Sequence, residues 1–338
     1  MDRIPLNPTR RRCHRLLLGG AMALAAAGAA QAAESITADD DVGARDAALV
    51  ESLRRSREAL EWTDSLVRHE WRLQRHAAGA DWRIVDPRER TVVRGSVGEC
   101  RRQFASLEQD GTIPPVRGAV LILLHGLGED RGSMHPLAEH LRGELDATVL
   151  TFGYASVRHD IDAHGRSLAD VIAGLPEATR ISFVGHSLGN LVVRRWMSLA
   201  TQPSLDRVHR MVMLGPPNQG SDLARMAAGL GLAGHLEGAA RDLVDWRRVA
   251  PLLAVPPCDF GIIAGGRGDA AGYSQLLEGD DDAVVRVEET RLDGAEDFLI
   301  VPVHHAAMMH DAAVRRATVT FLESGRFAAT DRAEPAGK

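Results

Sequence analysis

A serine flanked by glycines follows an apolar run of the chain. Residues 185–189 read Gly-His-Ser-Leu-Gly, the spacing G-x-S-x-G, and they come directly after the apolar residues 181–184. A strand, a tight turn and a helix in this order expose the serine hydroxyl at a helix N-terminus, where developing negative charge is stabilised. The glycines leave room for neighbouring backbone at the turn. This setting predicts that Ser187 is a catalytic nucleophile.

A nucleophilic serine needs a base, and in this type of site the histidine comes last along the chain, after the acid. The histidines that follow Ser187 are His209, His235, His304, His305 and His310. His304 and His305 come directly after an apolar run at residues 298–301. The other three precede a strand, lie in an inserted segment or come about one helical turn later. The pattern therefore leaves His304 and His305 as candidates for the base.

The acid that orients the histidine should follow the apolar run at residues 260–264. Four aspartates do so, and they are Asp269, Asp280, Asp281 and Asp282. Asp269 lies closest to the end of that run. Residues 280–282 form an aspartate triplet, which in a non-catalytic setting would be a solvated loop or a weak calcium site. We expect two of these three aspartates to have only such a role.

The elements that must position these side chains alternate in type. After Pro115, short apolar runs are separated by amphipathic stretches with helical spacing. The runs are residues 119–124, 148–152, 181–184, 211–214, 260–264 and 298–301, and the helical stretches include 134–142, 163–173 and 188–199. Continuous apolar runs are typical of strands buried on both faces, and helices between them predict a parallel sheet. The sequence predicts an α/β fold with a mostly parallel sheet and helices on both faces.

Together these pieces resemble a known family. The loop His125-Gly126-Leu127-Gly128, the segment around Ser187, residues 215–221, residues 282–285 and residues 303–305 resemble small bacterial lipases and GPI inositol-deacylase-like hydrolases of the α/β-hydrolase superfamily. The resemblance covers roughly residues 118–325. It implies the α/β-hydrolase fold, and it implies that the amides of Leu127 and Leu188 bind the oxyanion. Without it, residues 125–128 could be a plain turn that ends a strand.

The resemblance also orders the candidates for acid and base. The family writes the acid as Asp-Gly-x-Val, which Asp282 matches except that Ala283 replaces the glycine, so Asp269 stays the runner-up. The family's histidine is followed by small residues and methionines, which His305 matches best, with His304 as the rival. His186 is expected to be structural and residues 216–221 to shape a supporting loop. Tyr154 and Ser156 are expected to line the pocket.

The implied activity is that of an exported serine hydrolase that cleaves a carboxylic ester through an acyl-enzyme, lipase- or esterase-like. The substrate would be a small-molecule or lipid ester, and a lipid would entail transient contact with a membrane surface. No metal or organic cofactor is required. The alternatives are an amidase or acyltransferase that uses the same triad, and a non-catalytic binding member of the fold. The oligomeric state is left open.

The remaining segments divide the chain into predicted parts. Residues 1–32 form a signal peptide, 33–117 an N-terminal extension, 118–325 the hydrolase domain and 326–338 a disordered tail. Within the hydrolase domain, the Ala- and Leu-rich residues 222–250 interrupt the alternation and predict a helical cap. Within the extension, the apolar spacing predicts a helix over 49–75, two short strands at 82–85 and 91–93, and a helix over 99–109.

The N-terminus has the features of an export signal. Arg10, Arg11, Arg12 and Arg15 precede an uncharged run at residues 16–33, and Ala-Gln-Ala at residues 30–32 predicts cleavage after Ala32. The consecutive arginines favour a twin-arginine signal, with general export or an uncleaved membrane anchor as alternatives. We therefore expect the protein to be periplasmic or extracellular.

Composition narrows the partners and the redox chemistry. The formal net charge of -6 and the lack of a long basic run after the first residues argue against a nucleic-acid partner. Cleavage would leave two cysteines, Cys100 and Cys258, which could form one disulfide after export or remain separate thiols. Neither has the spacing of a metal-binding cysteine pair.

Overall fold

The computed structural model describes residues 60–232 and 236–328. All of these residues belong to one structural unit. The predicted signal peptide, the start of the predicted helix over 49–75, His235 and nearly all of the predicted tail lie outside the described residues.

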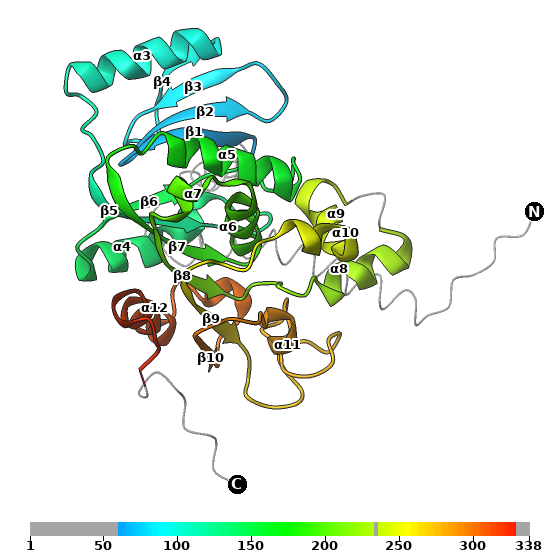
Figure 1. Cartoon of the computed structure of the whole chain (residues 1–338). Helices are drawn as coiled ribbons and strands as arrows, with labels where there is room; N and C mark the ends of the chain where they lie inside the picture. Colours follow the sequence, from blue (N-terminus) through cyan, green and yellow to red (C-terminus); the bar gives the residue numbers. More distant parts are fainter. Residues whose placement is uncertain (1–59, 233–235, 329–338) are drawn as a thin grey trace, which may run out of the picture. The chain divides into compact units, whose positions relative to one another are not determined.

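A six-stranded sheet forms the centre of residues 118–325 (Figure 1). Its strands are β5 (Gly118–Leu124), β6 (Thr148–Phe152), β7 (Ala178–His186), β8 (Val208–Leu214), β9 (Asp259–Gly265) and β10 (Asp297–Val301). They lie in the order β10-β9-β8-β7-β5-β6, and every neighbouring pair is parallel. The prediction of six buried parallel strands is therefore confirmed.

Helices cover both faces of this sheet, as predicted. They are α4 (His135–Glu144), α5 (Ile161–Ala173), α6 (Leu188–Leu199) and α12 (Ala312–Ser324). Successive side chains of a strand point to opposite faces, and in β5 Ile122 joins the core cluster that holds α5 and α6 while Leu123 joins the one that holds α4 and α12. Because both faces are covered, the strands read as continuous apolar runs.

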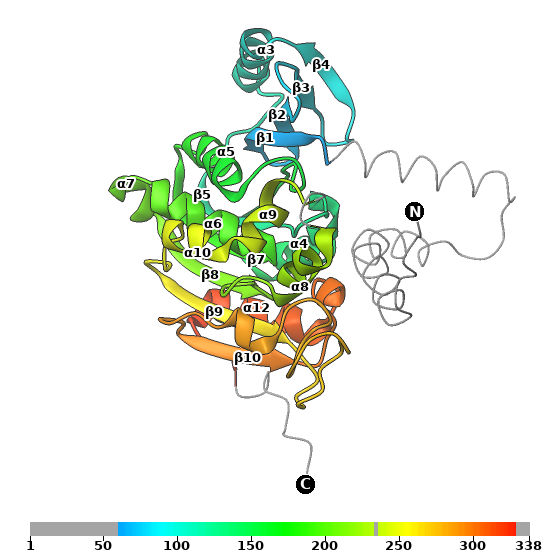
Figure 2. The same cartoon turned by 90° about the vertical axis from the view of Figure 1, so that its right-hand side faces the viewer.

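The insertion between β8 and β9 is helical. It contains α8 (Asp222–Ala227), η2 (Ala228–Leu232), α9 (Gly238–Val244), α10 (Trp246–Val249) and η4 (Ala250–Leu252). The end of this segment lies beside α6 (Figure 2), where Arg194 Nε donates to the carbonyl of Ala254 at 2.8 Å. The segment matches the predicted helical insertion, and its role as a cap stays a prediction.

The N-terminal extension forms a second sheet, and one prediction about it is wrong. The antiparallel strands β1 (Trp62–Arg68), β2 (Trp71–His76), β3 (Trp82–Val85) and β4 (Thr91–Gly95) lie in that order, with α3 (Val97–Gln109) packed against the sheet. The expected strands and second helix are confirmed. Residues 62–76, however, form a hairpin and not the end of a helix, with a turn at His69, whose φ is 54°.

Buried polar residues attach this second sheet to the end of β6. Asp64 accepts hydrogen bonds from Arg72 at 2.6 Å and from the amide of Gly153 at 2.7 Å. Arg72 also donates to the carbonyl of Thr151 at 2.7 Å. The predicted helix was based on the spacing of the apolar residues alone. It did not take into account that polar residues of this segment are buried as well.

The two described cysteines do not form a disulfide. Cys100 is buried within α3 and Cys258 is half-buried directly before β9, and both are free thiols. The disulfide alternative is therefore wrong for this structure. None of the helices in residues 60–232 and 236–328 combines the length and apolar character that crossing a membrane requires.

Candidate active site

The predicted site residues gather at the carboxyl ends of the strands. Ser187 comes directly after β7, Leu127 follows β5, Asp282 follows β9 and His305 follows β10. Since all six strands are parallel, these ends form one edge of the sheet. The order of the strands, the helices on both faces and the strand–turn–helix at Ser187 are those of the α/β-hydrolase fold.

Ser187 has a strained backbone at the N-terminus of α6. Its φ of 50° and ψ of -120° lie in a region that residues with a side chain rarely adopt. The turn also leaves no space beside it: a Cβ on Gly185 would lie 2.4 Å from Asn190 Oδ1, and one on Gly189 would lie 2.6 Å from the carbonyl oxygen of Leu124. The glycines of the G-x-S-x-G motif are therefore sterically required, and the strain presents the Ser187 side chain at the edge of the sheet.

Asp282 and His305 form a buried hydrogen-bonded pair. His305 Nδ1 donates to Asp282 Oδ2 at 2.6 Å, and the backbone amide of His305 donates to the Asp282 carbonyl at 2.9 Å. The other carboxylate oxygen, Oδ1, accepts from the amides of Val284 at 3.0 Å and Val285 at 2.7 Å. The Asp282 side chain is 0% exposed, and hydrogen bonds to both carboxylate oxygens hold its orientation.

Electrostatics around His305 favour its charged form. Burial disfavours the imidazolium, but the charge and hydrogen bond of Asp282, helped by the charge of Glu129, outweigh burial and raise the pKa of His305 above its ordinary value. Glycine at position 215 leaves room for the His305 ring beside Asp282, because a Cβ there would lie 3.0 Å from His305 Nδ1. The arrangement suits a general base whose protonated state is stabilised.

The rival acids and the rival base have other partners. Asp269 and Asp280 accept hydrogen bonds from backbone amides of residues 267–272, and Asp281 accepts from the amides of Ser274 and Ala283. In the described part of the chain none of the three hydrogen-bonds to a histidine. His304 is exposed and its ring packs against Tyr273 at a tilt of 40°, with ring centroids 3.9 Å apart.

The departure from the family's acid motif is visible in the backbone. Ala283 stands where the resemblance expects glycine, and its φ is 82°. This left-handed conformation is the one that favours glycine. Ala283 therefore keeps the local shape that holds Asp282, at a cost in backbone strain.

Two backbone amides remain available near Ser187. Leu188 is the first residue of α6, and the first amides of a helix have no partner within the helix. Across residues 60–232 and 236–328, no hydrogen bond engages the amide of Leu188 or that of Leu127. Such free amides are what an oxyanion site requires.

Glu129 is a residue of this region that sequence reasoning missed. Its Oε2 lies 3.2 Å from Nδ1 of His186 and accepts from the amide of Gly126 at 2.9 Å. His186, expected to be structural, is buried and has its Nε2 3.2 Å from the carbonyl oxygen of His305. Nothing in the sequence marks Glu129 except its place directly after the His-Gly-Leu-Gly loop.

Tyr154 and Ser156 support the loop at residues 125–128, and their expected place in the lining of a pocket stays a prediction. Tyr154 is buried, and its hydroxyl donates to the carbonyl of His125 at 2.6 Å. Ser156 Oγ accepts from the amide of Gly128 at 3.0 Å. Residues 216–221 do shape a supporting loop, in which buried Asn218 accepts from Arg194 at 2.9 Å.

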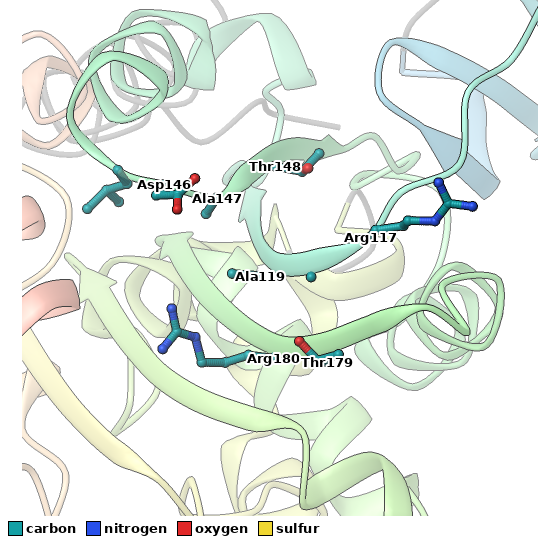
Figure 3. A pocket seen from close by; sticks show the side chains of 9 residues that line it. Arg117, Ala119, Asp146, Ala147, Thr148, Thr179 and Arg180 are labelled. Carbon is teal, nitrogen blue, oxygen red and sulfur yellow. The ribbon is translucent and has the colours of Figure 1, made fainter.

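A hollow of about 650 Å³ lies elsewhere, at the amino ends of the strands (Figure 3). Its lining comes from the starts of β5, β6 and β7 and includes Arg117, Ala119, Asp146, Thr148, Thr179 and Arg180. It contains none of the predicted site residues. Within the described ranges, no group of three or more histidine, cysteine or acidic side chains is arranged to hold a metal ion.

Comparison with known proteins gives one family match. Residues 94–241 match a family described as a domain of unknown function, DUF7379. This part of the chain contains Leu127, Ser187 and Leu188 and ends before Asp282 and His305. No curated protein matches the chain.

Several solved structures are similar in fold. Lipase BlEst2 of Bacillus licheniformis in its propeptide form is 18% identical, over 66% of this chain and 54% of that one, with a TM-score of 0.48. Its mature form is 18% identical, over 62% of this chain and 90% of that one, with a TM-score of 0.47. Phospholipase PlaB of Legionella pneumophila is 23% identical, over 51% and 45%, with a TM-score of 0.41. The chain thus spans about half the length of the first of these.

Proposed function

We propose that the chain is a serine hydrolase that cleaves a carboxylic ester, with Ser187 as nucleophile, His305 as base and Asp282 as the acid that orients it. The observation that carries the proposal is the 2.6 Å hydrogen bond between His305 and Asp282 at the edge of the sheet where Ser187 follows β7. Of the four candidate aspartates, Asp282 is the one with this contact.

In the proposed reaction, Ser187 Oγ attacks the carbonyl carbon of the ester while Nε2 of His305 takes the hydroxyl proton. Asp282 keeps the hydrogen of the neutral ring on Nδ1 and stabilises the imidazolium that forms. The amides of Leu127 and Leu188 donate to the oxyanion. His305 then returns the proton to the leaving alcohol, and a water molecule, activated in the same way, releases the acid from the acyl-enzyme.

The proposed substrate is a small-molecule or lipid ester. A lipid substrate would bring the protein into transient contact with a membrane surface. Two other activities use the same residues, namely cleavage of an amide and transfer of the acyl group to an acceptor other than water. Product analysis with ester, amide and alcohol-acceptor substrates distinguishes these reactions.

The test is Ser187→Ala compared with Ser198→Ala, which removes an exposed hydroxyl from the same helix, α6. We expect wild type and Ser198→Ala to react with a fluorophosphonate and to hydrolyse p-nitrophenyl butyrate. Ser187→Ala should do neither, with turnover reduced by roughly six orders of magnitude and an unchanged melting temperature. Hydrolysis near the wild-type rate by Ser187→Ala would contradict the proposal. A wild-type chain that fails to react with the fluorophosphonate would favour a non-catalytic binding protein.

We also propose that the protein is exported and that its mature chain begins at or near Ala33. Intact-mass measurement of the protein from the periplasm and the medium tests this. A full-length chain retained in the membrane fraction would instead support an anchor.

A further inference from the structure

One carboxylate oxygen of Glu129 gathers three partners from different segments. Glu129 Oε2 accepts from the amide of Gly126 at 2.9 Å and from Ser133 Oγ at 2.9 Å, and it lies 3.2 Å from His186 Nδ1. The side chain is 17% exposed. Hydrogen bonds to an ionised carboxylate are short and strong, so three of them on one oxygen restrict the distances between the three partners.

His186 extends this network to the base. The ring is buried, and its Nε2 lies 3.2 Å from the carbonyl oxygen of His305. Both partners of His186 are hydrogen-bond acceptors, so the ring lies between the carboxylate of Glu129 and the backbone of His305. The rings of His186 and His305 also pack together, with centroids 4.6 Å apart.

The network reaches each of the three segments that the proposed reaction uses. Gly126 precedes the oxyanion donor Leu127, His186 precedes the nucleophile Ser187, and His305 is the base itself. We infer that Glu129 is a positioning residue, which sets the spacing between the oxyanion loop, the nucleophile and the base. This inference rests on the proposed function.

The carboxylate keeps its charge over a wide pH range. Burial would raise the pKa of Glu129, but His186 and the amide of Gly126, with a smaller contribution from His125, lower it far below its ordinary value. The titratable groups that face it are therefore His186, His125 and, through His186, His305. Tyr154 also lies within its field.

If Glu129 is a positioning residue, its removal should weaken stabilisation of the transition state and leave the affinity for the substrate nearly unchanged. A shift of about 1 Å in the reacting groups lowers the rate by roughly a hundredfold. We therefore expect Glu129→Ala to lower kcat on p-nitrophenyl butyrate by about that factor, with KM within about twofold of wild type. Glu129→Gln should recover part of the loss, because its amide oxygen can still accept from Gly126.

Butylboronic acid supplies a second measurement. Ser187 Oγ bonds to boron, His305 takes the proton, and the resulting tetrahedral anion resembles the transition state. If Glu129 positions the site, the inhibition constant for this acid should weaken in proportion to the loss of kcat/KM in both variants. A residue that served only to hold the fold together would lower the melting temperature without this proportionality.

The matched control is Asp130→Asn. It neutralises the neighbouring carboxylate, which accepts from the amide of Gly132, whereas Gly126 and His186 hydrogen-bond to the carboxylate of Glu129. We expect Asp130→Asn to keep kcat, KM and boronate affinity near wild type. If Glu129→Ala does not fold, Glu129→Gln decides by the same measurements.

The inference is overturned if Glu129→Gln and Glu129→Ala keep the wild-type kcat and boronate affinity, or if Asp130→Asn loses as much as they do. Both results leave the proposed function intact when hydrolysis still depends on Ser187. Hydrolysis that survives Ser187→Ala overturns the proposed function itself, so the two failures are separate.

Discussion

His305 Nδ1 lies 2.6 Å from Asp282 Oδ2, and the two residues come from loops that follow adjacent parallel strands, β9 and β10. A carboxylate only accepts hydrogen bonds, so Nδ1 must be the donor. In the neutral ring this leaves the lone pair on Nε2, the nitrogen that takes a proton in the proposed reaction. The pair therefore fixes the tautomer that a general base needs.

Removing the charge of Asp282 should lower turnover strongly. We expect Asp282→Asn to reduce kcat by roughly 10⁴-fold with little change in KM, because the amide favours the wrong tautomer of His305. The same change at Asp269, Asp280 and Asp281 serves as the control, since none of them hydrogen-bonds to a histidine in the described residues. Turnover at saturating substrate is the measurement. Should Asp269→Asn prove worse than Asp282→Asn, the assignment of the acid is wrong.

The two adjacent histidines should differ sharply. His305→Ala is expected to lower kcat by about as much as Ser187→Ala, because nucleophile and base act as one unit. His304→Ala should lose far less, since its ring is exposed and packs against Tyr273. Steady-state kinetics of both variants decides between them, and a larger loss in His304→Ala would exchange their roles.

The acidic side of the pH profile should report His305. The base must be neutral, and its pKa is raised above the ordinary value of 6.5 by Asp282. We therefore expect kcat/KM to rise with pH through a midpoint above 6.5. In Asp282→Asn the residual activity should have its midpoint at lower pH, because burial then lowers the pKa of His305 with only the smaller effect of Glu129 against it. A midpoint that does not move in this variant would contradict the assigned contact.

Sequence patterns predicted the parts of this structure that depend on local chemistry. The six apolar runs became the strands of one sheet covered by helices, and Gly185 and Gly189 marked the turn at Ser187 because no side chain fits there. From the residues alone, the acid and the base were each left open, and the resemblance put Asp282 and His305 first. The structure then showed that these two side chains are hydrogen-bonded to each other. Their separation along the sequence does not by itself predict this contact.

What the sequence did not reveal depends on long-range contacts of polar residues. Asp64 and Arg72 look like solvated positions, yet both side chains are 0% exposed because they pair with each other and with the end of β6. Both residues belong to the hairpin that residues 62–76 form, although the apolar residues of this segment fit helical spacing. Glu129 was missed for the same reason, since its partner His186 is distant in the sequence.

Ala283 offers a test of strain beside the acid. Its φ of 82° costs a residue with a Cβ roughly 1–2 kcal/mol relative to glycine, while glycine gains some freedom in the unfolded chain. We expect Ala283→Gly to raise the free energy of unfolding by about 0.5–1 kcal/mol, which raises the melting temperature by about 2 °C.

The control is Ala105→Gly in the middle of α3, where the same change meets ordinary helical backbone. There it should lower stability by about 0.5–1 kcal/mol, because glycine loses more freedom on folding. Thermal unfolding of the two variants beside wild type measures both effects, and they should have opposite signs.

Because Asp282 is held by the amides of Val284 and Val285 whatever residue occupies position 283, kcat should stay near wild type in Ala283→Gly. A stable variant with strongly reduced kcat would instead mean that the alanine keeps the loop rigid enough to aim the carboxylate at His305. A lowered melting temperature would mean that the Ala283 methyl group contributes more to packing than its backbone strain costs.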